Sequence, residues 1–551
     1  MDKWLFDMYK TLSHLNISSQ DVLNHFLKVH AEELKNFYFE IIEDHVAVKA
    51  NDAFEVKAYL NGSKVISTIS TMSLSGYRYA LNAILNWIKS NPSEELLLAD
   101  QPHFTFRGVI EGFYGKPWSH EQRLRSLDFF GDFGMNAYFI APKDAPWQRF
   151  NWRAPFKNEF LDLTKKLVTR GALNGVSVAV CVSPGLSVKY SDPSDIDAVI
   201  TRYRQLYEIG VNHFGLLWDD ISWELQHPED IKQYSSTAKA HSDFSNKVYE
   251  KLLSIDSEIK LTVCPMHYNG RGVIPYIEEL GSQLSPEINL MWTGRQICSE
   301  YLDISDAVIF EKSARRKPFY WDNFPVNDGS MQPNLYIGPI RGREKGLHKH
   351  SIGLLSNPML QGEASLIPLS TIGEYLWNSE KYDADAAWER ALEKVIPIIS
   401  ERASLRHFFR TSLGSTVGGD PAPDLRKVFN AGVALWRSGK IEASSEVFRN
   451  AGNEIISHYK ILMTQSFSNQ TLIEEIREWL GKYELGGRTL LGVADVLHRC
   501  TFDQEKQMIS GPAGSSTQIS ELLDQLRAHK KRLFGDQIEG PFSELIAELE
   551  A

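Results

Sequence analysis

The chain has 551 residues, of which 43% are hydrophobic and 23% are charged, so it can bury large cores and divide into two or three domains. Its formal net charge of -11 argues against a general affinity for nucleic acid or for anionic membranes, because binding phosphate groups needs clustered Lys and Arg. A neutral or weakly charged ligand fits this composition better.

The start of the chain, MDKWLFDMYKTL, has neither the basic nor the apolar segment of a secretory signal. Further along, no uncharged apolar run reaches the length of about 18 residues that a membrane-spanning helix needs. We therefore expect a soluble cytoplasmic protein without membrane partners. The cysteines are widely spaced without a CxxC pattern, which fits neither a disulfide framework nor a zinc cluster. We expect free thiols at Cys181, Cys264, Cys298 and Cys500.

The range 1–102 predicts a small α/β domain. It contains the β-like runs HVAVKA, FEVKAYL and KVISTIS. These are followed by the helix-like GYRYALNAILNWIKS and by the acidic segment PSEELLLADQP, which we interpret as a linker.

The range 103–385 predicts a (β/α)8 TIM barrel, because short β-rich runs alternate with amphipathic stretches at intervals of roughly 30 to 45 residues. Between the first two runs, Ser119 followed by Gln122 is the capping-box pattern of a helix start. The alternative, an open doubly wound sheet, fits less well because polar residues follow nearly every run instead of gathering at one switch point. The eight runs begin at Phe104, Asn136, Val176, His213, Ile259, Ile288, Pro318 and Ser351.

The range 386–551 predicts a helical C-terminal domain packed on the barrel. Its amphipathic stretches include AAWERALEKVIPIIS, DLRKVFNAGVALWRSG and TLIEEIREWLGKYELGGRTLLGVADVLH. This region could shape a groove for the leaving part of a substrate or form a homodimer contact, and the sequence does not choose between them.

Two adjacent carboxylates, Asp219 and Asp220, follow the apolar run of the fourth predicted strand in the segment LLWDDI. Like charges this close perturb each other's ionisation. In a partly desolvated barrel mouth, one carboxyl group is driven toward the neutral acid while the other stays ionised. Such a pair can divide the roles of acid and anion. The alternative is structural, with the first Asp capping a helix and the second in its first turn.

Other predicted strand ends carry polar and aromatic residues that weaken the structural alternative. Amides and carboxylates bind hydroxyl groups, and aromatic faces pack on the C–H faces of sugar rings. Converging on one rim, these residues predict a sugar-binding pocket. In strand order they are Gly112, Phe113, Tyr114, Lys143, Asp144, Tyr268, Asn269, Trp292, Trp321, Asn323, Asp328 and Asn357.

The remaining candidates carry less chemistry. The basic loop at 341–350, RGREKGLHKH, lacks the GKS or GKT sequence of a phosphate-binding loop, so we interpret it as a solvated loop. His267, His348 and His350 form no metal-ligand set with nearby Cys. We therefore expect no metal and no cofactor.

The strand-end residues and the segments around them, in their order along the chain, resemble those of glycoside hydrolase family 84. This is the family of bacterial β-N-acetylglucosaminidases and of the eukaryotic enzymes that remove O-linked N-acetylglucosamine from proteins. The resemblance covers essentially the whole predicted barrel. Its segments are RGVIEGFYGKPWSHEQR, APKDAPWQRFNWRAPF, LLWDDI, AHSDFSNKVY, the WTG of MWTG, WDNFPVND, YIGPIRGR and LLSNPM.

The resemblance implies a retaining exo-β-N-acetylglucosaminidase that works by substrate-assisted catalysis, in which the 2-acetamido oxygen attacks the anomeric carbon and forms an oxazoline. It implies that Asp219 orients the acetamido group, and that Asp220 protonates the leaving oxygen and then deprotonates water. Tyr268 would donate a hydrogen bond to the acetamido carbonyl. The other implied pocket residues are Gly112, Lys143, Trp292, Trp321, Asn323, Asp328 and Asn357.

A catalytically silent glycan-binding module is the alternative function, but binding alone does not need a proton-transferring acid. The implied partner is terminal β-linked N-acetylglucosamine on a protein or glycan, without nucleic acid. Modified protein, cell-wall fragments and free oligosaccharides stay open as natural substrates.

Overall fold

The computed structural model describes residue 15 and residues 17–44, 52–90, 94–505 and 508–550. The chain folds into two compact units. The first, which we call the barrel unit, contains Met1–Phe324, Gly342–Pro358 and Ile372–Tyr382. The second, the helical unit, contains Pro325–Arg341, Met359–Thr371 and Asp383–Ala551. The predicted domain boundaries at residues 102 and 385 stay predictions.

A four-stranded sheet in the order β1-β3-β2-β4 opens the barrel unit. Strand β2 (Phe54–Asn61) alternates buried and exposed residues, as expected for a sheet with one covered face. It pairs antiparallel with both β3 (Lys64–Thr71) and β4 (Leu96–Asp100), whereas β1 (Tyr38–Asp44) pairs parallel with β3. The predicted α/β character is confirmed. The helices beside this sheet are α2 (Ser19–Val29), α3 (Ala31–Leu34) and α4 (Leu74–Lys89).

Two details of this region differ from the sequence analysis. The segment interpreted as a linker contains β4, an edge strand that pairs with β2. Strand β1, the opposite edge, was not predicted, because its half-exposed and partly acidic sequence YFEIIED lacks a buried apolar face. The predicted strand HVAVKA, at 45–50, lies outside the described residues.

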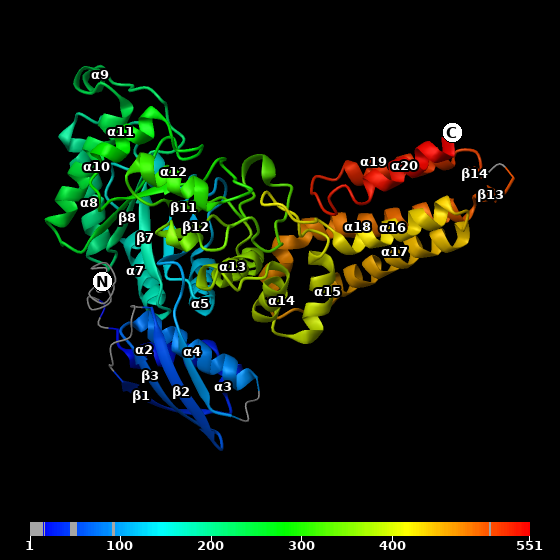
Figure 1. Ribbon diagram of the computed structural model, residues 1–551, viewed down its shortest axis with the longest axis horizontal. Coiled ribbons are helices and arrows are strands. Elements are labelled where there is room, and N and C mark those ends of the chain that lie inside the picture. Colours follow the sequence, from blue (N-terminus) through cyan, green and yellow to red (C-terminus); the bar gives the residue numbers. More distant parts are fainter. Residues whose placement is uncertain (1–14, 16, 45–51, 91–93, 506–507, 551) are drawn as a thin grey trace. The chain divides into compact units, whose positions relative to one another are not determined.

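Eight parallel strands close into a barrel, which confirms the predicted (β/α)8 fold. Every predicted run contains one of them, and Figure 1 shows helices such as α8 and α10 outside the strands. The strands are β5 (Phe106–Glu111), β6 (Ala137–Ile140), β7 (Ser177–Val182), β8 (His213–Leu217), β9 (Lys260–Cys264), β10 (Asn289–Trp292), β11 (Phe319–Asp322) and β12 (Gly353–Ser356).

Helices lie between successive strands along the chain, except between β11 and β12, where only 3-10 turns are described, and a further helix follows β12. The first of them, α5 (His120–Asp132), begins with the predicted capping box: the Ser119 side chain accepts from the Gln122 amide, and the Gln122 side chain accepts from the Ser119 amide. The others are α6 (Pro146–Arg149), α7 (Asn158–Leu173), α8 (Pro193–Tyr207), α9 (Pro228–Gln233), α10 (Thr237–Leu253), α11 (Pro275–Gln283), α12 (Ile304–Ala314) and α13 (Gly362–Trp377), with 3-10 turns η1 (Gly329–Met331) and η2 (Leu347–Lys349).

The barrel interior is filled by alternate strand residues that form one hydrophobic cluster, including Ile110, Phe139, Leu217, Met291 and Phe319. Because the lumen is packed with side chains, a ligand has access only to the ends of the barrel. Residues that follow the carboxyl ends of the strands are therefore the ones that can meet a substrate.

The helical unit is mostly α-helical, as predicted. Its longest helices, α17 (Ile441–Thr464) and α18 (Gln470–His498), approach closely at Gly452 and Gly487, where an added Cβ on Gly487 would come within 2.7 Å of Ile455. Within the part of the chain that the structure describes, no helix is long and apolar enough to cross a membrane. The other elements are α14 (Ala384–Val395), α15 (Ile399–Phe409), α16 (Pro423–Arg437), β13 (Thr501–Asp503), β14 (Met508–Ser510), α19 (Ser515–Arg527) and α20 (Glu539–Glu550).

Candidate active site

Asp219 lies directly beyond strand β8 and is 4% exposed. The ammonium group of Lys143, which follows β6 and is 2% exposed, donates a hydrogen bond to Asp219 Oδ2. Asp219 Oδ1 is also buried and has no hydrogen-bond partner among the described residues. A buried acceptor without a partner is costly, so this oxygen is poised to accept a hydrogen bond from a ligand.

Asp220 is exposed and adopts a left-handed backbone conformation with a φ of 56°. Such a conformation is uncommon for a residue other than Gly, and it often marks a functional site. No helix begins at either Asp, since α9 starts only at Pro228. The alternative interpretation of the pair as a helix cap is therefore wrong.

Three side chains hold Asp220 in place. The hydroxyl groups of Tyr114 and Tyr268 donate hydrogen bonds to its two carboxylate oxygens, at 2.7 and 2.9 Å. Arg149 donates to the Asp220 carbonyl oxygen at 2.9 Å and to the Tyr114 hydroxyl at 2.7 Å. The carboxylate of Asp220 is thus held by one hydroxyl donor on each oxygen.

These surroundings set the ionisation of Asp220. Burial raises the pKa of its carboxyl group, but the nearby Lys143 ammonium and the hydrogen bonds from Tyr114 and Tyr268 outweigh burial, and the pKa lies below its ordinary value. Burial and then the Asp220 carboxylate raise the pKa of both tyrosines, so their hydroxyls stay protonated donors. Without a ligand, Asp220 is therefore the anion. The sequence analysis expected one carboxyl group of the pair to be driven toward the neutral acid.

A second network joins the carboxyl ends of strands β5, β11 and β12. Asn323 Oδ1 accepts hydrogen bonds from Trp321 Nε1 and from Asn357 Nδ2, both at 2.9 Å. Asn357 Oδ1 in turn accepts from the Gly112 amide at 3.2 Å. Because the Lys143 ammonium lies 5.2 Å from the centre of the Trp321 ring, this amide network adjoins the carboxylates.

Gly112 is required by packing in this network. A Cβ at this position would lie 2.2 Å from Cζ2 of Trp321, closer than any two non-bonded carbons can approach. The absence of a side chain at Gly112 lets the indole of Trp321 lie against the backbone beyond β5.

A sequence profile described as β-N-acetylglucosaminidase matches residues 107–410, more than half of the chain. The chain belongs to this family. Apart from Phe106, the first residue of β5, the barrel strands and the strand-end residues described above lie within the matched range.

Similar proteins agree with glycoside hydrolase family 84. The Protein O-GlcNAcases of Rattus norvegicus and Mus musculus are each 30% identical over 274 residues, which is 49% of this chain and 29% of those proteins. A mutant of the Thermobaculum terrenum O-GlcNAc hydrolase superposes with a TM-score of 0.75 at 31% identity, covering 81% of this chain and 95% of the other. The structure titled CpGH84B gives 0.77 at 25% identity, covering 91% and 87%.

One predicted pocket residue lies away from these networks. Trp292 is 1% exposed and stacks on Phe310 of helix α12, with ring centres 4.7 Å apart. Its neighbour Met291 belongs to the barrel interior, and successive strand residues point to opposite faces, so Trp292 faces the helices. The prediction that Trp292 lines the pocket is therefore corrected. Asp328 belongs to the helical unit, where it precedes η1.

The sequence analysis missed Arg149, and it named Tyr114 among the strand-end residues but gave it no role in the pocket. Tyr114 carried a signal, since it lies in the same strand-end segment as Gly112. Arg149 ends the short helix α6, and only its place in the segment APKDAPWQRF, which resembles the family, could have suggested it.

Proposed function

We propose that this member of the family is a retaining exo-β-N-acetylglucosaminidase that uses the substrate's own acetamido group as the nucleophile. The observation that carries the proposal is the arrangement of adjacent carboxylates: one is buried with a vacant acceptor oxygen, and the other is exposed and ringed by hydroxyl donors. Their different surroundings suit different tasks.

Asp219 is suited to hold the acetamide. Lys143 occupies Oδ2, which leaves the buried Oδ1 to accept the acetamide N–H. This hydrogen bond would draw electron density toward the acetamido carbonyl oxygen and orient it below the anomeric carbon. Holding the nucleophile in that position replaces an encounter between two molecules with an intramolecular step.

Asp220 is suited to transfer the proton to the leaving oxygen. Substrate binding would displace the hydroxyl groups of Tyr114 and Tyr268 from its carboxylate and exclude water. Losing those donors and becoming more buried both raise the pKa of a carboxyl group, which turns the resting anion into an acid. Tyr268, once released, would donate to the acetamido carbonyl.

The amide network is suited to grip the sugar. Asn323 and Asn357 present amide groups, and Trp321 presents an aromatic face next to the Lys143 ammonium. We keep Asp328 as a candidate sugar ligand, and Gly112 as the residue that allows the Trp321 position.

The natural substrate is proposed to be O-linked N-acetylglucosamine on protein, because two curated relatives are named Protein O-GlcNAcase. The match spans 29% of the length of those relatives, so this assignment needs its own test. Rates on glycopeptides, chitobiose and muropeptides should be compared, and preference for the glycopeptide is expected. A cytoplasmic location and a dimer through the helical region stay predictions.

The decisive experiment measures hydrolysis of aryl β-N-acetylglucosaminides whose N-acyl methyl group carries an increasing number of fluorines. Fluorine withdraws electrons from the carbonyl oxygen, so the rate should fall steeply along the series if that oxygen is the nucleophile. A flat series would refute the mechanism, and no hydrolysis of the parent compound would favour a binding module. A thiazoline analogue of the oxazoline should inhibit strongly.

A further inference from the structure

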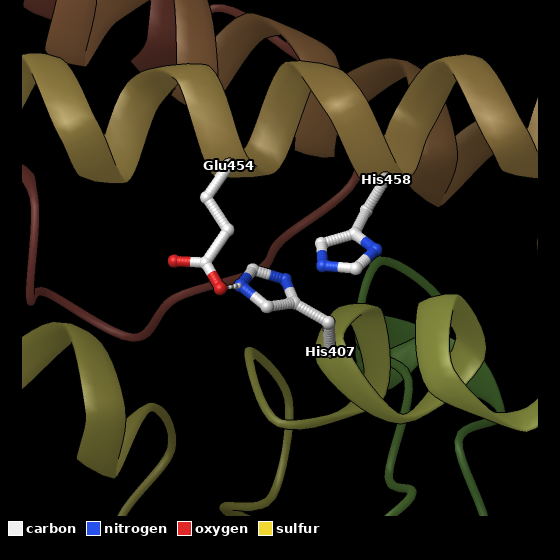
Figure 2. Close-up of side chains that lie close together, drawn as sticks. All are labelled: His407, Glu454 and His458. Atoms are coloured by element: carbon white, nitrogen blue, oxygen red, sulfur yellow. Dashed lines mark ion pairs between the residues drawn. The ribbon is translucent and has the colours of Figure 1, made fainter.

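Three side chains with metal-ligand chemistry meet in the helical unit, outside the active site. They are His407 from helix α15 and Glu454 and His458 from helix α17, and each can offer one ligand atom within 4.8 Å of the other two. Figure 2 shows the three side chains converging between the two helices. Glu454 and His458 are four residues apart, a spacing that puts both on one face of α17.

The two imidazole rings are arranged alike. Nδ1 of His407 is hydrogen-bonded with the hydroxyl of Tyr483 in α18, and Nδ1 of His458 lies 3.0 Å from Ser404 Oγ. When each Nδ1–H donates to its hydroxyl oxygen, Nε2 of each ring keeps a free lone pair. Histidines that bind metals are oriented in this way, by a hydrogen bond on the nitrogen that does not bind the ion.

The third group supplies charge. Nε2 of His407 lies 3.5 Å from the Glu454 carboxylate. Four-coordinate zinc with bonds of about 2.0–2.2 Å places neighbouring ligand atoms roughly 3.3 Å apart, so this pair already has the spacing. The His458 ring stacks on the His407 ring with centres 4.4 Å apart, so it has to turn about its side-chain bonds to bring a nitrogen to the same ion. Two imidazoles with one carboxylate are a ligand set that suits zinc and leaves a fourth position for water.

We propose that His407, Glu454 and His458 form a binding site for a divalent transition metal of the zinc class, which joins α15 to α17. The oxygen-only ligands that Mg²⁺ and Ca²⁺ prefer are not offered here, so those ions should not compete. The site does not depend on the glycosidase proposal, because none of its ligands belongs to the active site.

The surroundings of the two histidines affect their ionisation in the same direction. Burial and then the neighbouring His458 lower the pKa of His407 to about 4, although Glu454 and Asp424 raise it. Burial also lowers the pKa of His458, against the effect of Glu454. Both shifts favour the neutral ring over its charged form.

The test uses the full chain, stripped of metal with a chelator, and calorimetric titration with ZnCl₂ near neutral pH. We expect wild type to bind one more zinc ion than His458→Ala. Glu454→Gln, an isosteric change on the helix surface, should lower the zinc affinity of that site by about tenfold or more. Tyr483→Phe removes the hydrogen bond that orients the His407 ring, so it should lower the zinc affinity by about 10- to 100-fold. His498→Ala, which removes an exposed histidine of α18, is the matched control and should bind like wild type.

Co²⁺ supplies an independent readout, because a site with four ligands gives it strong visible absorption. That absorption should appear in wild type and His498→Ala and be lost in His458→Ala, and excess Mg²⁺ should not remove it. Equal zinc stoichiometry and affinity in wild type, His458→Ala and Glu454→Gln would overturn the proposal. If His458→Ala does not fold, equal affinities of wild type and Glu454→Gln would overturn it alone.

Discussion

The barrel mouth and the histidine cluster of the helical unit each gather ionisable groups, but they control ionisation in opposite ways. Around Asp220, the Lys143 ammonium and two tyrosine hydroxyls hold a carboxyl group in its charged form. Around His407, burial and a second imidazole hold the ring in its neutral form. A charged group that can be neutralised serves proton transfer, and a neutral base with a free lone pair serves metal binding.

The largest effect on activity is expected from removing the two carboxylates at the barrel mouth. Asp220→Ala should lower kcat/KM on an unactivated glycoside by about 10²- to 10⁴-fold, since its alkoxide needs a proton in the transition state. Aryl glycosides with acidic phenols should lose much less in the bond-breaking step. Asp219→Ala should lower kcat/KM on both substrate types, because acetamide attack precedes departure of either leaving group.

Steady-state kinetics on the two substrate types measures this difference, with Glu454→Gln as the control from the helical unit. Glu454→Gln should leave both rates unchanged. Equal leaving-group sensitivity in Asp219→Ala and Asp220→Ala would contradict the assigned roles, and retained activity in both would contradict the site.

A smaller effect is expected from the tyrosines that hold Asp220. Each donates a hydrogen bond that lowers the pKa of the Asp220 carboxyl group, so Tyr114→Phe or Tyr268→Phe should raise that pKa. The basic limb of the kcat/KM profile against pH should then move to higher pH, by roughly one unit for a charge-assisted hydrogen bond.

The two tyrosine variants should differ in rate. Tyr268→Phe should also lower kcat by about 10- to 100-fold, because the acetamido carbonyl loses a donor. Thermal unfolding should change little in both, and a loss of stability that matches the loss of activity would favour a core role instead. An unchanged pH profile in both variants would mean that the hydroxyls do not control Asp220.

Gly112→Ala should act through packing and not through charge. The new Cβ would overlap the Trp321 ring, and relieving such an overlap costs about 1–3 kcal/mol. We expect a rise in KM and a lower unfolding temperature. Gly540→Ala is the matched control, because nothing lies within 4 Å of the added Cβ and its φ is not positive. Equal behaviour of the two variants would argue against the close contact.

The smallest effect concerns stability and pH in the helical unit. The pKa of His407 is about 4 in the folded chain and about 6.5 when unfolded, so the unfolded state takes up the proton first. Stability should be unaffected above pH 6.5 and should fall between pH 6.5 and 4. Urea unfolding of wild type and His407→Gln at several pH values measures this loss of stability. If the free energy of unfolding depends on pH in the same way in both proteins, the lowered pKa of His407 is contradicted.

The β/α alternation predicted the barrel because eight buried parallel strands read as short apolar runs, and each run contains one observed strand. The edge strands β1 and β4 were not predicted from the sequence. They are largely exposed, so their sequences YFEIIED and LLLAD carry no alternation of buried residues. Local pattern predicts strands that have a buried face, such as β2 and the barrel strands, and fails at edge strands whose residues are mostly exposed.

Trp292 shows the limit of placing side chains from strand ends alone. The run was found, but whether a residue at its end faces the lumen or the helices depends on register, and a shift of one residue reverses the face. Arg149 and His407 show a second limit. Arg149 contacts Asp220 and His407 contacts His458, and in both pairs the partner lies far along the chain, so no short motif joins them.

By itself, the sequence determined the barrel, because that fold follows from apolar periodicity, and it singled out Asp219 and Asp220 by their residue type at a strand end. Only the tertiary structure decided which oxygen of Asp219 lacks a partner, which donors surround Asp220, and that two helices bring His407 to Glu454 and His458. Ionisation and ligand geometry depend on distances between groups that are remote in sequence, and those distances exist only once the chain has folded.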